Sequence, residues 1–156
     1  MGNVVPLLTA CGGFLLAVLW MDLIFDVQVF GHRGADELPE PVLASIAGYY
    51  HRATTTSRPM SRLIAVVMVS LLAALGFQAI RGHDPAWLLV MSALLAGIPT
   101  MLALTQTVPD AIRLGHRTDS PHEQTRLACS VCRDHLICLG CIVAFLTLWV
   151  ARALVV

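Results

Sequence analysis

The sequence predicts an all-α protein, a four-helix transmembrane bundle with a short amphipathic surface helix between helices 1 and 2. Four stretches contain no charged residue. The length of each is close to that of a bilayer-crossing helix, which needs about 20 mostly apolar residues. They cover 4–21, 63–80, 85–109 and 136–151. Hydrophobic residues make up 57% of the chain and charged residues 13%, which is unlike a water-soluble domain. We therefore expect one integral membrane domain over residues 1–156.

The arginines predict the orientation. All ten cationic side chains are arginines, and each of the two long connections between stretches holds four. The turn at Arg81 and the tail at Arg152 hold one each. Basic residues are enriched in loops that stay in the cytoplasm. We therefore expect a multi-pass protein with both long connections cytoplasmic and both termini outside. The expected location is the cell membrane, which in a bacterium is the inner membrane. The balanced formal charge argues against a nucleic-acid partner.

Helix 1 is expected over about residues 6–30, with Pro6 in its first turn. Near its end, Asp22 and Asp26 are four residues apart and so share one face. A carboxylate inside the membrane costs at least about 2.5 kcal/mol, so it usually faces a partner or a water-filled cavity. The alternative is that both aspartates reach the lipid headgroups.

The connection after helix 1 contains the predicted surface helix, near residues 41–53. Pro39 and Pro41 punctuate the chain before it. Apolar and aromatic residues then recur at helical spacing: Val42, Leu43, Ile46, Tyr49, Tyr50 and Ala53. Such a pattern favours a helix that lies on the inner membrane surface with its tyrosines at headgroup level.

Helices 2 and 3 are expected over about 60–80 and 86–107. The short turn between them makes them antiparallel neighbours, and Pro99 permits a kink in helix 3. Helix 4 is expected over 121–153, because Ser120 and Glu123 match a capping box around Pro121. It is longer than a membrane is thick, so its first three turns should project into the cytoplasm. One stripe on it gathers polar residues and a thiol: Glu123, Arg126, Ser130, Asp134 and Cys141, with Arg133 alongside.

Four cysteines form two Cys-x-x-Cys pairs, which begin at Cys129 and Cys138. Helical geometry points these thiols in different directions, so one straight helix cannot converge them on a zinc ion. A Cys-x-x-Cys at the start of a late helix is similar to the membrane oxidoreductase family that includes vitamin K epoxide reductase. This chain lacks that family's cysteine pair in a connecting loop, and its arginines place Cys129 on the reducing side. Buried unreactive thiols are favoured, and thiol redox chemistry stays as an alternative.

Metal and cofactor signals are weak. Five histidines and several carboxylates lie at the predicted cytoplasmic end, but no His-x-x-x-His or Glu-x-x-His spacing occurs. We assign no metal ligand and leave the cofactor unknown. The helix layout, the Thr107-Val108-Pro109 segment and the polar opening of helix 4 are similar to small four-helix anthrone-oxygenase-like membrane proteins. No residue role is transferred from that likeness.

The buried polar groups favour a membrane-embedded enzyme that acts on a lipophilic or amphiphilic substrate at the cytoplasmic leaflet. The candidate catalytic residues are Asp22, Asp26, His135 and His51, with Asp22 as general base or ligand and a histidine as its acid–base partner. The candidate substrate-binding residues are Arg133, Arg62, Arg126, Asp134 and Tyr50. Arg133 and Arg62 could instead form structural ion pairs with Asp22 or Asp26.

Other functions and partners fit the same sequence. A small transporter or channel subunit would place Asp22 on an ion or proton pathway, and a non-catalytic scaffold would use the arginines to hold lipid or a partner. The expected partners are membrane lipid and a lipophilic or anionic small molecule, with a homo-oligomer as a further possibility.

Overall fold

The structure, a computed structural model, describes residues 4–32, 34–82 and 84–155. Its elements are α1 Val5–Asp26, η1 Val27–His32, α2 Glu40–His51, η2 Arg52–Thr56, α3 Arg58–Arg81, α4 Ala86–Leu102, η3 Ala103–Thr107, α5 Val108–His116 and α6 Pro121–Val155. No strand occurs among these described residues. Four helical runs are long and apolar enough to cross a membrane: Val5–His32, Pro59–Arg81, Ala86–His116 and Pro121–Leu154. The all-helical prediction and the four long apolar helices are confirmed.

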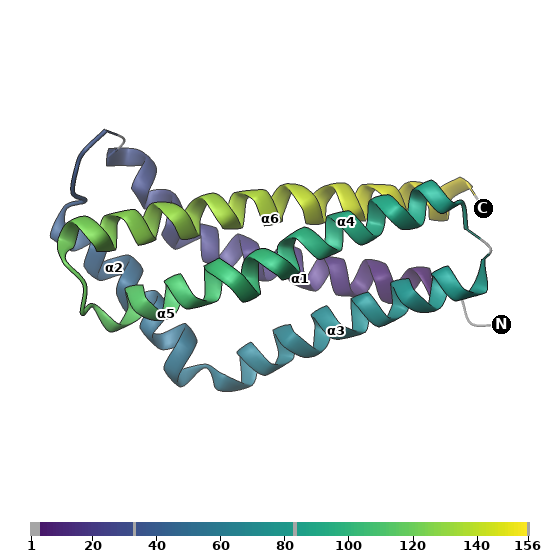
Figure 1. The fold of residues 1–156 in the computed structure, drawn as a ribbon, viewed down its shortest axis with the longest axis horizontal. Helices are drawn as coiled ribbons and strands as arrows, with labels where there is room; N and C mark the ends of the chain where they lie inside the picture. The colour runs from purple at the N-terminus through teal and green to yellow at the C-terminus, as the bar shows by residue number, and fades with distance from the viewer. Residues whose placement is uncertain (1–3, 33, 83, 156) are drawn as a thin grey trace.

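The four long runs form a bundle (Figure 1). Neighbouring helices contact in the order α1, α6, α4, α3 and back to α1. One end of the bundle, which we call the loop end, contains α2, η2, α5 and the start of α6. The opposite end, which we call the terminal end, contains the start of α1, the turn at Gly82 and the end of α6.

Apolar side chains cover the outside of the bundle as well as its core. Val69 on α3 and Leu104 on η3 are 66% and 69% exposed, whereas Phe145 and Trp149 on α6 are fully buried. An apolar outer surface of this extent is typical of helices surrounded by lipid. The indole N–H of Trp149 donates to the Ser92 hydroxyl of α4 at 3.0 Å, so the polar atom of this buried ring has a partner.

Proline and glycine set the helix ends. Pro6, Pro41 and Pro59 stand in the first turns of α1, α2 and α3, where no backbone N–H is needed. α3 ends at Gly82, whose φ of 65° is left-handed and favours glycine. At the start of α6, the Ser120 hydroxyl accepts the backbone N–H of Glu123 at 3.3 Å, as in the predicted capping box.

The helix in the first connection, α2, packs against the protein. Leu43, Ile46 and Ala47 are buried in a core cluster that also includes Leu114 of α5. An added Cβ at Gly115 of α5 would lie 2.8 Å from the backbone nitrogen of His51, so α2 and α5 approach as closely as only glycine allows. The apolar face that predicted a surface helix therefore contacts α5 and α6, and its tyrosines point into the bundle.

The third long helix continues beyond its predicted end. It reaches His116 through η3, a wide π-type turn in which the Val108 N–H bonds to the Ala103 carbonyl, five residues back. Pro109 stands in the first turn of α5 immediately after this turn. The wide turn accommodates the missing N–H of Pro109 without a break, because the backbone bonds have already changed their spacing.

Candidate functional site

A buried carboxylate, an imidazole and a phenol meet at the loop end of the bundle. Asp26 of α1 is 1% exposed. Its Oδ2 lies 2.6 Å from Nδ1 of His135 on α6, and its Oδ1 accepts the Tyr50 hydroxyl of α2 at 2.6 Å. Three helices far apart in the sequence thus supply one hydrogen-bonded cluster, which satisfies a carboxylate that burial alone would make costly.

The second aspartate lies on the other side of the imidazole. Oδ1 of Asp22 accepts the Tyr49 hydroxyl at 2.5 Å, and its Oδ2 lies 3.9 Å from Nε2 of His135. That last distance is too long for a hydrogen bond, so a gap separates the two groups. The ring of Tyr49 stacks on Phe25 with centroids 4.2 Å apart, which holds the phenol in place from behind.

We assign the proton positions on His135 from these contacts, with Asp26 as an ionised carboxylate. A carboxylate only accepts hydrogen bonds, so Nδ1 carries a hydrogen toward Asp26. In the neutral ring, Nε2 is then left with a free lone pair on the side of Asp22. This arrangement is a histidine base oriented by a carboxylate, with its reactive nitrogen directed away from that carboxylate.

The two tyrosines act as hydrogen donors. Burial raises the pKa of both Tyr49 and Tyr50 above the ordinary phenol value, and the carboxylates of Asp22 and Asp26 raise it further. Both phenols therefore keep their protons at neutral pH.

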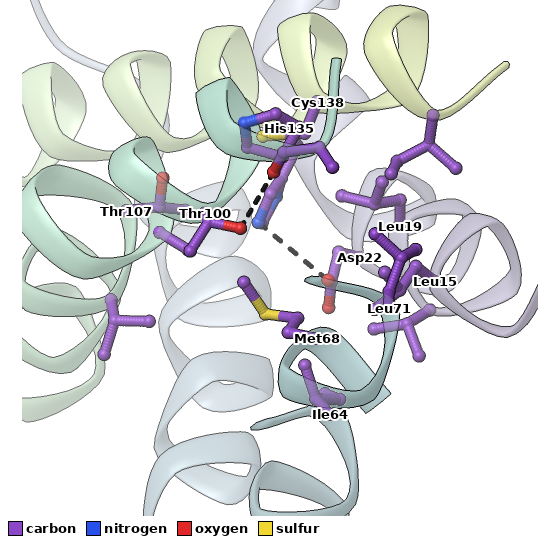
Figure 2. Close-up of a pocket in the computed structure, with 16 residues that line it drawn as sticks. Leu15, Leu19, Asp22, Ile64, Met68, Leu71, Thr100, Thr107, His135 and Cys138 are labelled. Atoms are coloured by element: carbon purple, nitrogen blue, oxygen red, sulfur yellow. Dashed lines mark hydrogen bonds and ion pairs between the residues drawn. The ribbon is translucent and has the colours of Figure 1, made fainter. Parts of the chain in front are cut away.

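A partly open apolar cavity adjoins the gap between His135 and Asp22. It has a volume of about 180 Å³ and is lined by residues of all four long helical runs. Figure 2 shows the His135 and Asp22 side chains pointing toward each other across it, with Leu71 and Met68 on its apolar walls. The lining residues are Leu15, Val18, Leu19, Asp22, Ile64, Met68, Leu71, Ala96, Pro99, Thr100, Ala103, Thr107, Val108, His135, Cys138 and Ile142.

A second fully buried carboxylate, besides that of Asp26, belongs to a neighbouring ion pair. The Asp134 side chain is 1% exposed, accepts the Thr107 hydroxyl at 3.3 Å and lies 3.2 Å from the guanidinium of Arg133. Arg133 itself is 65% exposed. The hydrogen bond between Thr107 and Asp134 connects the wide turn η3 to α6. Thr107 also lines the cavity, so this contact lies beside it.

The structure brings together some of the predicted site residues and separates others. Asp22, Asp26, His135 and Tyr50 form the cluster, and Asp134 and Arg133 lie next to it along α6. The remaining predicted residues are exposed and lie outside it: His51, Arg62 and Arg126. Arg126 pairs with Glu123 at 2.6 Å.

The alternative in which Arg133 pairs with Asp22 or Asp26 is not what the structure shows. Asp26 pairs with His135, and Arg133 pairs with the adjacent Asp134. The rotation of α6 explains this, since it points His135 at α1 and leaves the Arg133 guanidinium near the outside.

Two site residues were not predicted in this role. Tyr49 was expected at the headgroups, and Thr107 was noted only beside Pro109. The close approach of α2 to α1 brings both adjacent tyrosines to the two aspartates, and the wide turn directs Thr107 inward. Neither the packing of α2 on α1 nor the wide turn changes the hydropathy pattern, so the sequence could not predict the positions of Tyr49 and Thr107.

The described residues show neither a metal-ligand cluster nor a disulfide. Within the described ranges, no three His, Cys, Asp or Glu side chains gather in a way that would hold a metal ion. All five cysteines are free thiols. Cys129 is exposed, while Cys138 is buried and lines the cavity.

No family model, curated protein or solved structure matches this chain. Its function must therefore be argued from the site alone.

Proposed function

We propose that this protein is a membrane-embedded enzyme that moves a proton within a lipophilic substrate bound in the cavity, with His135 as the general acid and base. The observation that carries the proposal is the geometry of His135, which is held by Asp26 through Nδ1 and presents Nε2 to an apolar cavity. A cavity of this kind with one convergent polar end is the usual form of a small-molecule site.

The chemistry needs only the groups in the site. Nε2 of His135 accepts a proton from a weakly acidic C–H or O–H of the substrate, and the Asp26 carboxylate stabilises the imidazolium that forms. The imidazolium then returns the proton to a second substrate atom, so the net reaction is an isomerisation without a co-reactant. Asp22, 3.9 Å from Nε2, borders the position where the substrate group would contact both residues.

The apolar walls support this function. Electrostatic interactions are stronger where water is excluded, so a pair of charges formed between Asp26 and the imidazolium is better stabilised here than in water. The volume of about 180 Å³ slightly exceeds that of an engineered cavity of about 150 Å³ that binds benzene. It fits one substituted ring or a short chain.

The distribution of arginines supports a location at the cytoplasmic leaflet. The loop end contains Arg113 and Arg117 as well as Arg52, whereas the terminal end has Arg81 and Arg152. By the enrichment of basic residues in cytoplasmic loops, the loop end faces the cytoplasm and the site opens near the inner leaflet.

Deuterium incorporation tests the proposal without a known substrate. Lipophilic weak carbon acids are incubated with the protein in D₂O and analysed by mass spectrometry. We expect the wild type to catalyse deuterium incorporation into at least one compound, and His135→Asn to lose it by about 100-fold or more. His122→Asn is the matched control, because His122 is an exposed histidine in the first turn of the same helix.

The contrary result is also defined. If the wild type incorporates no deuterium above background, and Asp22→Asn abolishes proton flux in proteoliposomes, the protein is a transporter and the enzyme proposal is wrong.

A further inference from the structure

A second hollow lies on the loop side of Asp22. It has a volume of about 370 Å³ and is bordered by α1, α2 with η2, and the start of α3. Val18, Asp22 and Ile64 line both this hollow and the apolar cavity, so the two spaces adjoin at these residues. Figure 2 labels Asp22 and Ile64 among the residues that line the cavity.

The hollow is more polar than the cavity because Arg52, Ser57 and Ser61 line it. Among the described residues, Arg52 has neither an ion-pair partner nor a hydrogen-bond partner for its guanidinium, and its side chain is exposed. The side chain lies back along α2, since its Nη1 is 3.7 Å from the position that a Cβ on Gly48 would occupy.

Other arginines of the loop end are used differently. Arg113, Arg117 and Arg126 each contact a carboxylate at 2.9 Å or less. The pairs of Arg113 and Arg117 connect neighbouring segments, and the pair of Arg126 lies within the first turns of α6. Arg52 is directed to a hollow, and a guanidinium with free donors binds carboxylate or phosphate through two parallel hydrogen bonds.

The two volumes limit what could bind. The apolar cavity alone holds about one ring or a short chain, so a larger molecule extends beyond it, and the hollow past Asp22 adjoins it on the loop side. We propose that the substrate of the enzyme is an amphiphile with an anionic head, which Arg52 binds in the hollow while the apolar part enters the cavity between Val18 and Ile64. This inference rests on the proposed function, because it assigns the substrate class of the same site.

The charges also fix the direction of the substrate. Asp22 lies at the inner end of the hollow and repels an anion, and Arg52 attracts it at the outer end. An anionic head is therefore held away from His135, and the apolar part is placed beside Nε2. A cationic head would instead be drawn to Asp22, which gives the opposite order of affinities.

Binding of three probes with the same apolar part tests the inference. The probes are 4-phenylbutyrate, 4-phenylbutan-1-ol and 4-phenylbutylammonium, measured by calorimetry on the full-length protein in nanodiscs of neutral lipid. We expect the carboxylate to bind most tightly. Arg52→Gln should weaken its binding about tenfold and leave the alcohol unchanged. Arg62→Gln is the matched control, an exposed arginine on α3 that does not line the hollow.

Several results would overturn the inference. They are tightest binding by the ammonium probe, equal loss of carboxylate binding in the two arginine variants, or an unchanged affinity in Arg52→Gln. A folded-yield comparison of both variants separates loss of the site from loss of the fold. Because binding is measured without turnover, a failure here differs from a failure of His135 in the deuterium experiment.

Nanodiscs that contain phosphatidylglycerol identify the source of the anion. If this lipid competes with 4-phenylbutyrate in the wild type and not in Arg52→Gln, the head in the hollow is that of a lipid. If it does not compete while Arg52→Gln still weakens the probe, the ligand is a free anionic amphiphile. Both results support the anion site.

Discussion

Replacement of Asp26 by asparagine should reverse the proton positions on His135. In the wild type, the carboxylate accepts hydrogen bonds from Tyr50 and from Nδ1 of His135, both at 2.6 Å. The amide of asparagine accepts through one atom and donates through the other. If its oxygen keeps the Tyr50 hydroxyl, its NH₂ faces Nδ1, which must then lose its hydrogen. The opposite orientation would leave the buried Tyr50 hydroxyl hydrogen without an acceptor.

The expected magnitude follows from these two contacts. Two hydrogen bonds to a charged acceptor contribute about 1.5–3 kcal/mol each, and their neutral replacements about 0.5–1.5 kcal/mol each. Asp26→Asn should therefore lower the free energy of unfolding by about 2–3 kcal/mol. Asp26→Ala should cost more, about 3–5 kcal/mol, because it leaves two buried donors unpaired. Turnover should fall about 100-fold to 10,000-fold in Asp26→Asn, since the base is replaced by a donor at Nε2.

Nitrogen NMR of histidine-labelled protein measures the tautomer directly. His135 is assigned from the signal that disappears in His135→Asn. The wild type should show hydrogen on Nδ1, and Asp26→Asn should show it on Nε2. Asp22→Asn is the matched control, because Asp22 lies 3.9 Å from Nε2 and makes no hydrogen bond to the ring. An unchanged tautomer in a folded Asp26→Asn variant would refute the orienting role of Asp26.

Three further predictions concern packing and pH. Gly115→Ala should destabilise the protein by about 1–3 kcal/mol in thermal unfolding, because backbone occupies the space for its methyl group, whereas Gly140→Ala, in open space, should not. Ser92→Ala should cost about 1–3 kcal/mol by the same measurement, because it leaves a buried indole N–H without an acceptor. The Arg117 guanidinium holds the pKa of Glu40 below its usual range. Glu40→Gln should therefore destabilise the protein slightly at neutral pH, and this difference should disappear as the pH falls through the lowered pKa of Glu40. Equal melting curves of the two proteins at neutral pH would contradict the prediction.

Uncharged stretches were sufficient to predict the four long helices. Hydropathy reports which residues avoid water over a whole helix length, and that property does not depend on how the helices pack. The placement of Asp22 and Asp26 on one face was equally accessible, because a spacing of four residues is a local property of a helix. The structure confirms that both side chains point into the bundle.

Packing decided what the sequence could not predict. The partner of Asp26 depends on the rotation of α6 about its axis, and this rotation is set by the sum of many apolar contacts. The sequence left open whether the aspartates meet a histidine such as His135 or form an ion pair with Arg133. The continuation of the third long helix past Pro109 was not predicted either. Proline usually ends a helix of regular hydrogen-bond spacing, but it fits directly after a wide turn.

The wide turn η3 has a consequence for how this protein can change. Each residue of an α-helix rotates the next side chain by about 100°, so an extra residue in one turn resets the angular phase of everything that follows. Residues before Ala103 line the cavity together with Ala103, Thr107 and Val108, and α5 contacts α2. A deletion of one residue within η3 would rotate α4 and α5 relative to each other, so the cavity lining before the turn and the contact of α5 with α2 could not both be kept. Substitutions leave the phase intact, so they can change the cavity wall without this rotation.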